Sequence, residues 1–133
     1  LVNTKDHPVK EMPGVEEIRW VPLKDALKTT LGFDHKDILE ACAEKLKRRV
    51  RTAPIGFELL PEKFTLSELQ TLYELILDKE LDKRNFRKKI LGMGVLNVLN
   101  EKQKGVAHRP ANLYSFDIDR YKQLVIDGSG FEL

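Results

Sequence analysis

The chain has 133 residues, of which 41% are hydrophobic, and carries a net charge of +2 at pH 7, which suits one globular domain with or without a fragment of another. No apolar run reaches the roughly 18 residues that a membrane helix needs, and no secretory leader opens the chain, so we expect a cytoplasmic protein with no membrane partner. The single cysteine, Cys42, excludes an internal disulfide and a multi-cysteine zinc site.

The positive charge is concentrated in one part of the chain. Residues 83–109 contain eight Lys or Arg and one acidic residue, Glu101, although the chain as a whole is nearly neutral. This distribution favours a directed surface for one anionic partner over general adhesion to polyanions.

Residues 1–34 are expected to be the C-terminal remnant of a larger domain. Residues 17–21 are typical of a strand, and residues 22–31 have the spacing of a short helix. Elements this short do not bury Trp20 and Phe33 by themselves, so we expect the rest of their core to lie outside this segment.

A long helix is predicted from Asp34 to about Arg51. Apolar side chains recur every four residues along one stripe, which places Cys42 in a core rather than at a reactive site. The stripe consists of Ile38, Cys42, Leu46 and Val50. The last turns are rich in Lys and Arg, which complement the negative end of the helix dipole, and direct phosphate contact is the alternative.

The next helix has a strong start signal. Thr65 and Glu68 have the spacing of a capping box, and Phe64 and Leu69 that of a hydrophobic staple. A wide apolar face then continues to about Asp78, as in a helix that packs on a core. Only a short turn separates this helix from the next one, and that spacing predicts a helix-turn-helix.

Asp82–Leu91 is predicted to be the second helix of this motif. Asp82 is a good N-cap, and Phe86 and Ile90 share the face that packs on the core. Lys83 and Arg84 lie in the first turn, where the helix dipole disfavours cations, so helix stability does not explain them. Arg and Asn read base edges in the major groove, and Lys and Arg neutralise phosphates, so a nucleic acid does explain them.

A β-hairpin is predicted after this helix. Residues 95–100 and 112–116 are typical of strands, and the basic segment 101–112 between them forms the wing of a winged helix. Residues 119–126 have some helical character. The expected fold is therefore mainly α with a small β-hairpin (α+β), a winged helix-turn-helix over residues 35–133.

Candidate DNA-contacting residues come from the start of the first motif helix, the outer face of the second, and the wing. They are Thr65, Ser67, Gln70, Lys83, Arg84, Asn85, Arg87, Lys88, Lys102, Lys104, His108 and Arg109. For Thr65, helix capping is an equally good explanation, and basic hairpin loops are also common on proteins that bind nothing. The three histidines lack spaced metal-ligating partners, and no nucleophile or triad motif is present, so we expect no metal, no cofactor and no catalytic residue.

Three separated motifs carry a resemblance to a known family. They are residues 64–70 (FTLSELQ), residues 81–90 (LDKRNFRKKI), and Gly105 with residues 108–111 (HRPA) and 113–116 (LYSF). Together they resemble the C-terminal winged-helix domain of the Nudix-related transcriptional regulators, the NrtR-like family, over about residues 36–116. Residues 19–23 (RWVPL) resemble the last strand of the Nudix-like domain that precedes it.

The resemblance implies a bacterial transcriptional regulator that binds double-stranded DNA at a palindromic operator, as a homodimer in the full-length protein. It also implies a small-molecule effector, of the ADP-ribose type or from a sugar pathway, bound by the Nudix-like domain. The Nudix box itself does not occur in this sequence. Two other interpretations stay open: the C-terminal appendage of a Nudix hydrolase resembling ADP-ribose pyrophosphatase, and a winged helix that only pairs with protein.

Overall fold

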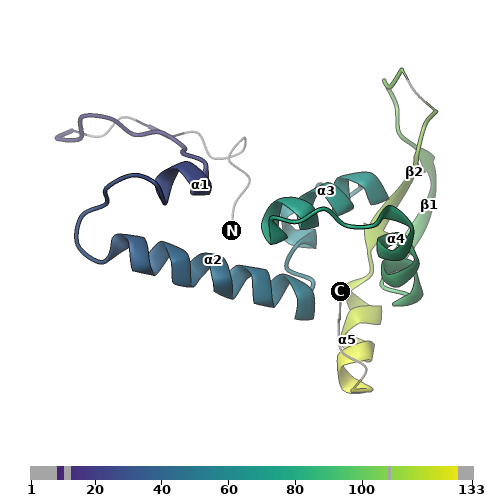
Figure 1. The fold of residues 1–133 in the computed structure, drawn as a ribbon. Helices are drawn as coiled ribbons and strands as arrows, with labels where there is room; N and C mark the ends of the chain where they lie inside the picture. Colours follow the sequence, from purple (N-terminus) through teal and green to yellow (C-terminus); the bar gives the residue numbers. More distant parts are fainter. Residues whose placement is uncertain (1–8, 11–12, 108, 129–133) are drawn as a thin grey trace. The chain divides into compact units, whose positions relative to one another are not determined.

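The computed structural model describes residues 9–10, 13–107 and 109–128, and the chain forms two compact units, Leu1–Lys45 and Leu46–Leu133 (Figure 1). Within the described residues, no helix is both long enough and apolar enough to cross a membrane. The elements in chain order are α1 (Leu23–Ala26), α2 (His35–Thr52), the 3₁₀ turn η1 (Phe57–Leu59), α3 (Leu66–Leu77), α4 (Lys83–Gly92), β1 (Leu96–Lys102), β2 (Asn112–Phe116) and α5 (Ile118–Ile126).

The first unit contains less regular structure than the sequence pattern indicates. The strand predicted at residues 17–21 is wrong, because this segment is irregular and no strand among the described residues pairs with it. The helix predicted over residues 22–31 shortens to the four residues of α1. Trp20 and Phe33 are 53% and 98% exposed, so this unit does not bury them.

The long helix α2 forms nearly as predicted, but most of its apolar stripe is not core. Ile38 is 49% exposed and Cys42 is also exposed, so the prediction of a buried Cys42 is wrong. Val50, in the last turn, is fully buried and belongs to the core of the second unit. The periodicity predicted the helix correctly, whereas burial depends on which neighbours the stripe meets.

The core of the second unit is built from most of its elements, and side chains of β1 and α5 pack against it. Its ten buried side chains come from α2, η1, α3, α4, β2 and the segments just before α3 and β1: Val50, Phe57, Phe64, Leu66, Leu69, Tyr73, Phe86, Ile90, Val95 and Tyr114. Phe57 stacks on Phe116 at a ring-centroid distance of 4.3 Å, and Phe116 lies 6.0 Å from Tyr121 of α5. This aromatic cluster attaches the terminal helix to the rest of the unit.

The hairpin is tied directly to the start of α3. β1 and β2 pair antiparallel, with Leu96 opposite Phe116 and Val98 opposite Tyr114, and an irregularity follows Val98. On its other side, Tyr114 exchanges two backbone hydrogen bonds with Phe64, of 3.0 and 2.8 Å. The wing and the helix-turn-helix therefore share one backbone network, and the winged-helix prediction is confirmed (Figure 1).

Gly56 is buried against the ring of Tyr73. A Cβ at this position would lie 3.0 Å from Cε2 of Tyr73, whose buried ring would have to shift to make room for it. We expect Gly56→Ala to lower the free energy of unfolding by about 1–3 kcal/mol through overpacking, measured by urea denaturation. The matched control is Gly92→Ala, where a Cβ meets nothing within 4 Å. Equal stability of the two variants would contradict the overpacking.

Candidate nucleic-acid interface

Helix α4 is anchored through one face and capped at its start. Phe86 is 5% exposed and Ile90 is fully buried, and the Phe86 ring lies 5.8 Å from that of Tyr73 on α3. Oδ1 of Asp82 accepts the backbone N–H of Asn85 at 2.8 Å, which satisfies one of the free donors at the helix start. Cap and anchor hold the helix in a single orientation on the unit.

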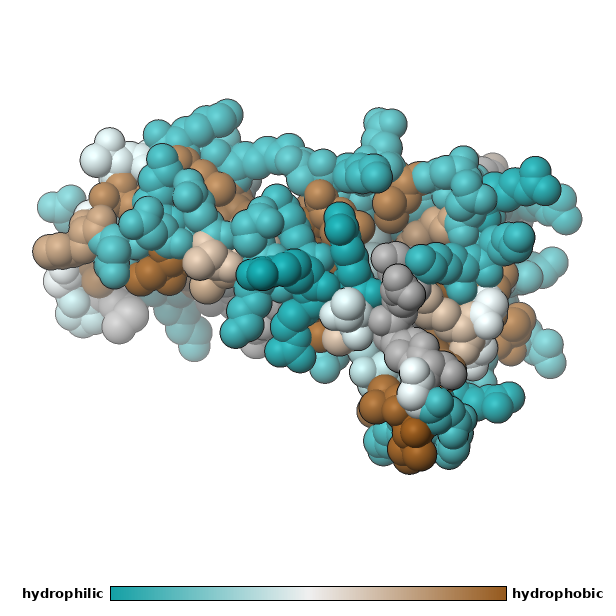
Figure 2. Space-filling model, turned by 60° about the horizontal axis from the view of Figure 1, so that its bottom comes forward, coloured by the Kyte–Doolittle hydropathy of each residue, from teal (hydrophilic) through white to brown (hydrophobic). Residues whose placement is uncertain are grey.

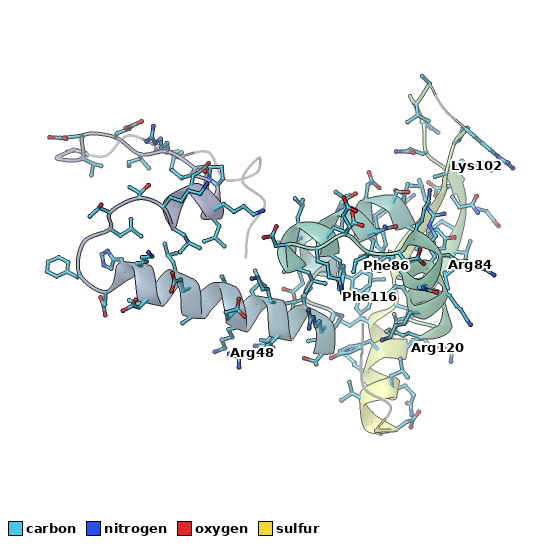
Figure 3. All side chains as sticks on the ribbon, viewed as in Figure 1. Arg48, Arg84, Phe86, Lys102, Phe116 and Arg120 are labelled. Atoms are coloured by element: carbon cyan, nitrogen blue, oxygen red, sulfur yellow. The ribbon has the colours of Figure 1, made fainter. Side chains whose placement is uncertain are left out.

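The opposite face of α4 is exposed and cationic. Lys83, Arg84, Asn85 and Lys88 are all exposed, and no acidic side chain in the described part of the chain forms an ion pair with the three cations. In Figure 3, the Arg84 side chain points outward from the unit, whereas Phe86 points toward its interior. Cations that are neither paired nor buried remain available to neutralise the phosphates of a polyanion.

Arg87 lies on the flank of α4 and not on its fully exposed face. Its side chain is half-buried, and Nη2 donates a hydrogen bond to Oγ of Ser67 at 3.1 Å. Its Nε is buried without a hydrogen-bond partner among the described residues. The sequence analysis places Arg87 and Lys88 together on the outer face of this helix. The structure separates them, because α3 covers the Arg87 side of the helix.

Two of the predicted contact residues are engaged inside the protein. Thr65 is 3% exposed, and its hydroxyl accepts the backbone N–H of Glu68 at 3.2 Å while donating to the Glu68 carboxylate at 2.9 Å. The capping box is therefore present, and capping is the role that the geometry supports for Thr65. The side-chain amide of Gln70 likewise donates to groups within the protein, whereas Ser67 is exposed.

A small polar network fixes the turn between α3 and α4. The side-chain amide of Gln70 donates to the carbonyl of Leu81 at 3.0 Å and to Oε1 of Glu74 at 2.9 Å. The same Oε1 accepts the backbone N–H of Leu81 at 3.0 Å. Both backbone groups of Leu81, the residue before the Asp82 cap, are thus bound to side chains of α3. The sequence analysis missed this role, although Gln70 and Glu74 have the i, i+4 spacing of a helical side-chain pair.

These hydrogen bonds make the turn sensitive to acid. The Leu81 N–H and then the Gln70 amide lower the pKa of Glu74 below its ordinary value. A lowered folded-state pKa stabilises the fold above the ordinary pKa, and this stabilisation is lost as pH falls through the lowered value. Between about pH 6 and about pH 3, we expect the free energy of unfolding to decrease less in Glu74→Gln than in the unchanged protein, measured by urea denaturation.

The matched control for the acid sensitivity is Glu80→Gln, which replaces an exposed carboxylate in the same turn. Its pH profile is expected to follow that of the unchanged protein. An unchanged acid response in Glu74→Gln would contradict the role of the network.

The wing presents further cations. Lys102, at the end of β1, is exposed and projects outward in Figure 3, and Lys104 is exposed in the loop that follows. Arg109 is also exposed, whereas the predicted contact residue His108 lies outside the described residues. The one acidic residue of this segment, Glu101, is paired with Lys63, with Nζ–O distances of 2.7 and 2.8 Å. That pair partly neutralises the negative charge beside the wing lysines.

The helix-turn-helix and wing match a known protein family. Residues 56–116, which include η1, both motif helices and the hairpin, match the family described as the NrtR DNA-binding winged helix domain. The winged-helix segment of this chain is thus similar to that of the NrtR family. The resemblance drawn from residues 64–70, 81–90 and 105–116 is therefore confirmed.

A curated relative extends the NrtR match toward the N-terminus. Over 121 residues, the chain is 36% identical to a protein of Acinetobacter baylyi named "ADPR responsive transcriptional repressor NtrR". The alignment covers 91% of this chain and 48% of that protein. The chain thus spans about half the length of this relative.

Two solved structures share the fold. The crystal structure of Shewanella oneidensis NrtR complexed with a 27mer DNA aligns with a TM-score of 0.65 and 33% identity, covering 77% of this chain and 46% of that one. A second crystal structure of Shewanella oneidensis NrtR aligns with a TM-score of 0.63 and 34% identity, covering 83% of this chain and 50% of that one.

In the described part of the chain, no group of three or more His, Cys, Asp or Glu residues is placed to hold a metal ion. Polar groups described in the second unit instead serve caps, the interhelical turn and the exposed cationic face. This arrangement presents the cationic face of the anchored helix α4 together with the basic wing to an anionic partner.

Proposed function

We propose that this chain is the DNA-binding part of an NrtR-type transcriptional regulator. Helix α4 enters the major groove, where Arg84, Asn85 and Lys88 contact bases and phosphates. The observation that carries the proposal is the exposed cationic face of α4, which is held by a buried Phe86 and bears no ion pair to a described acidic residue. The Acinetobacter relative, named a transcriptional repressor, and the Shewanella NrtR complex with a 27mer DNA support the same function.

The wing and the flank of α4 bind the phosphate backbone in this proposal. The wing supplies Lys102, Lys104 and Arg109, with His108 as an untested member of the same loop. Lys83, in the first turn of α4, contacts phosphate, and Ser67 and Arg87 form a second contact where α3 meets α4. Thr65 and Gln70 act indirectly, by capping α3 and fixing the turn.

The remaining parts of the proposal concern the whole protein. We infer a homodimer on a palindromic operator, with half-sites separated by one helical turn of about 34–36 Å or a multiple of it. Residues 35–133 form the DNA-binding domain, since α2 runs without a break into the second unit, and residues 1–34 belong to a Nudix-like part that binds an effector of the ADP-ribose type. The protein acts in the cytoplasm, on the nucleoid, and is not an enzyme.

The Nudix hydrolase appendage is the second candidate. The relative at 36% identity is named a repressor, which favours regulation over hydrolysis. Turnover of ADP-ribose by the full-length protein, without any binding of this chain to DNA, would favour the hydrolase over the regulator.

The test separates base reading from phosphate contact. A duplex enriched from a random-sequence library by the chain itself serves as the specific probe, and a scrambled duplex as the non-specific one. We expect Arg84→Ala to weaken binding to the enriched duplex by about 1–3 kcal/mol and to the scrambled duplex by less, measured by fluorescence anisotropy. We expect Arg87→Ala to weaken both duplexes alike, because the structure places Arg87 on the flank beside Ser67.

Lys122→Ala is the matched control, since it removes an exposed cation from α5. It is expected to leave both affinities unchanged. Failure of the unchanged chain to bind either duplex would overturn the proposed function.

A further inference from the structure

A cavity of about 340 Å³ opens on the flank of α4 opposite Arg87. It lies wholly within the second unit, between the last turn of α2, the end of α3, the interhelical turn and α4. Its floor includes Leu77, Leu81 and Phe86, and the two leucines are only half-buried, so part of their apolar surface faces the cavity. The volume falls within the range of small-molecule sites, about 300–1,000 Å³.

The rim of the cavity is cationic. Arg51, Lys79 and Lys89 line it from three different elements, and all three are exposed. None of them forms an ion pair with an acidic residue in the part of the chain that the structure describes. The rim also contains Asp82, whose Oδ1 is engaged by the N–H of Asn85 as the helix cap. The cavity therefore combines an apolar floor with an excess of unpaired positive charge.

We propose that this cavity is a binding site for a small amphiphilic anion, a carboxylate carried on a hydrocarbon body. The hydrocarbon covers Leu77 and Leu81, and the carboxylate accepts charge-assisted hydrogen bonds from the rim cations. A bare phosphate would use the rim and leave the apolar floor in water, so the combination selects a ligand with both features. This site borders the proposed DNA-contacting face, since Asn85 also lines it, but Arg84, Lys88 and the wing do not.

The test titrates the full 133-residue chain with octanoate, using octanol and inorganic phosphate as partial probes, and follows binding by calorimetry and NMR shifts. We expect saturable one-to-one binding of octanoate, with octanol and phosphate weaker by roughly tenfold or more. Shifts are expected at Leu77 and Leu81. Absence of octanoate binding, or equal binding of octanol, would overturn the proposal.

Two variants locate the site. Lys79→Ala combined with Lys89→Ala is expected to weaken octanoate binding by roughly tenfold, because it removes two of the three rim charges. The matched control, Lys122→Ala on α5, is expected to bind octanoate as the unchanged chain does. Equal octanoate affinity of the double variant and the control would overturn the site.

DNA phosphate is the other source of an anion that could reach this rim. If the unchanged chain binds no octanoate but the double variant loses affinity for duplex DNA, the rim serves the DNA backbone and the ligand site is wrong. The proposed DNA-binding function would then still stand, so the two failures are distinguishable.

Discussion

Raising the salt concentration from about 50 to about 200 mM is expected to weaken binding of duplex DNA to this chain about 1,000-fold. Six cations, which no described acidic residue pairs, are available for phosphate contact: Lys83, Arg84, Arg87, Lys88, Lys102 and Lys104. Each phosphate that they neutralise releases condensed counterions, so the logarithm of affinity falls with the logarithm of salt at a slope near about −5. Anisotropy titrations at four or more salt concentrations measure this slope.

The wing offers a quantitative control for the salt effect. Removing both wing lysines, in Lys102→Ala with Lys104→Ala, is expected to reduce the magnitude of the slope by about 2. The α5 variant Lys122→Ala is expected to leave it unchanged. A slope near zero for the unchanged chain would contradict a phosphate-contacting surface, whatever the affinity.

Phe86→Ala is expected to lower the free energy of unfolding by about 3–5 kcal/mol and to abolish DNA binding at moderate temperature. The Phe86 side chain is 5% exposed, and its ring centroid lies 5.8 Å from that of Tyr73, so that it holds α4 against α3. Its loss leaves a cavity under the helix that carries Arg84 and Lys88. Urea denaturation measures the stability, and anisotropy at a temperature where the variant is still folded measures the binding.

The matched control is Leu91→Ala, which removes an apolar side chain that is 44% exposed on the same helix. We expect a much smaller change in stability, because little buried surface is lost. A Phe86→Ala variant that is as stable as Leu91→Ala would show that α4 is not anchored through Phe86. A folded variant that binds DNA normally would contradict the need for that anchor.

The helix-turn-helix could be predicted from the sequence because its signals are local. The Thr65 capping box and the Asp82 cap each act within three residues, and both are present as expected. The strand expected at residues 17–21 is absent because a strand is stable only with a partner, and β propensity alone does not supply one. Both predictions came from local residue patterns. A helix cap forms its hydrogen bonds within its own segment, whereas a strand needs hydrogen bonds from a second strand.

Individual side chains of the interface were harder to place. The helical wheel put Arg87 with Lys88, but contact with Ser67, twenty residues earlier in the chain, holds it on the flank. Gln70 was expected at the DNA and instead holds the turn, since Leu81 comes within hydrogen-bonding distance only when α3 and α4 pack together. A helical wheel gives directions around an axis and does not say which neighbour covers each direction.

By itself, the sequence determined where the motif helices begin, which face of α4 carries the anchor, and that positive charge gathers over residues 83–109. Only the tertiary structure decided that Phe64 pairs with Tyr114, that Cys42 is exposed while Val50 is buried, and that a cationic rim surrounds an apolar cavity. The physical reason is the range of the interactions. Caps and periodicity act over three or four residues, whereas burial and backbone pairing join residues far apart in the chain, whose proximity exists only after folding.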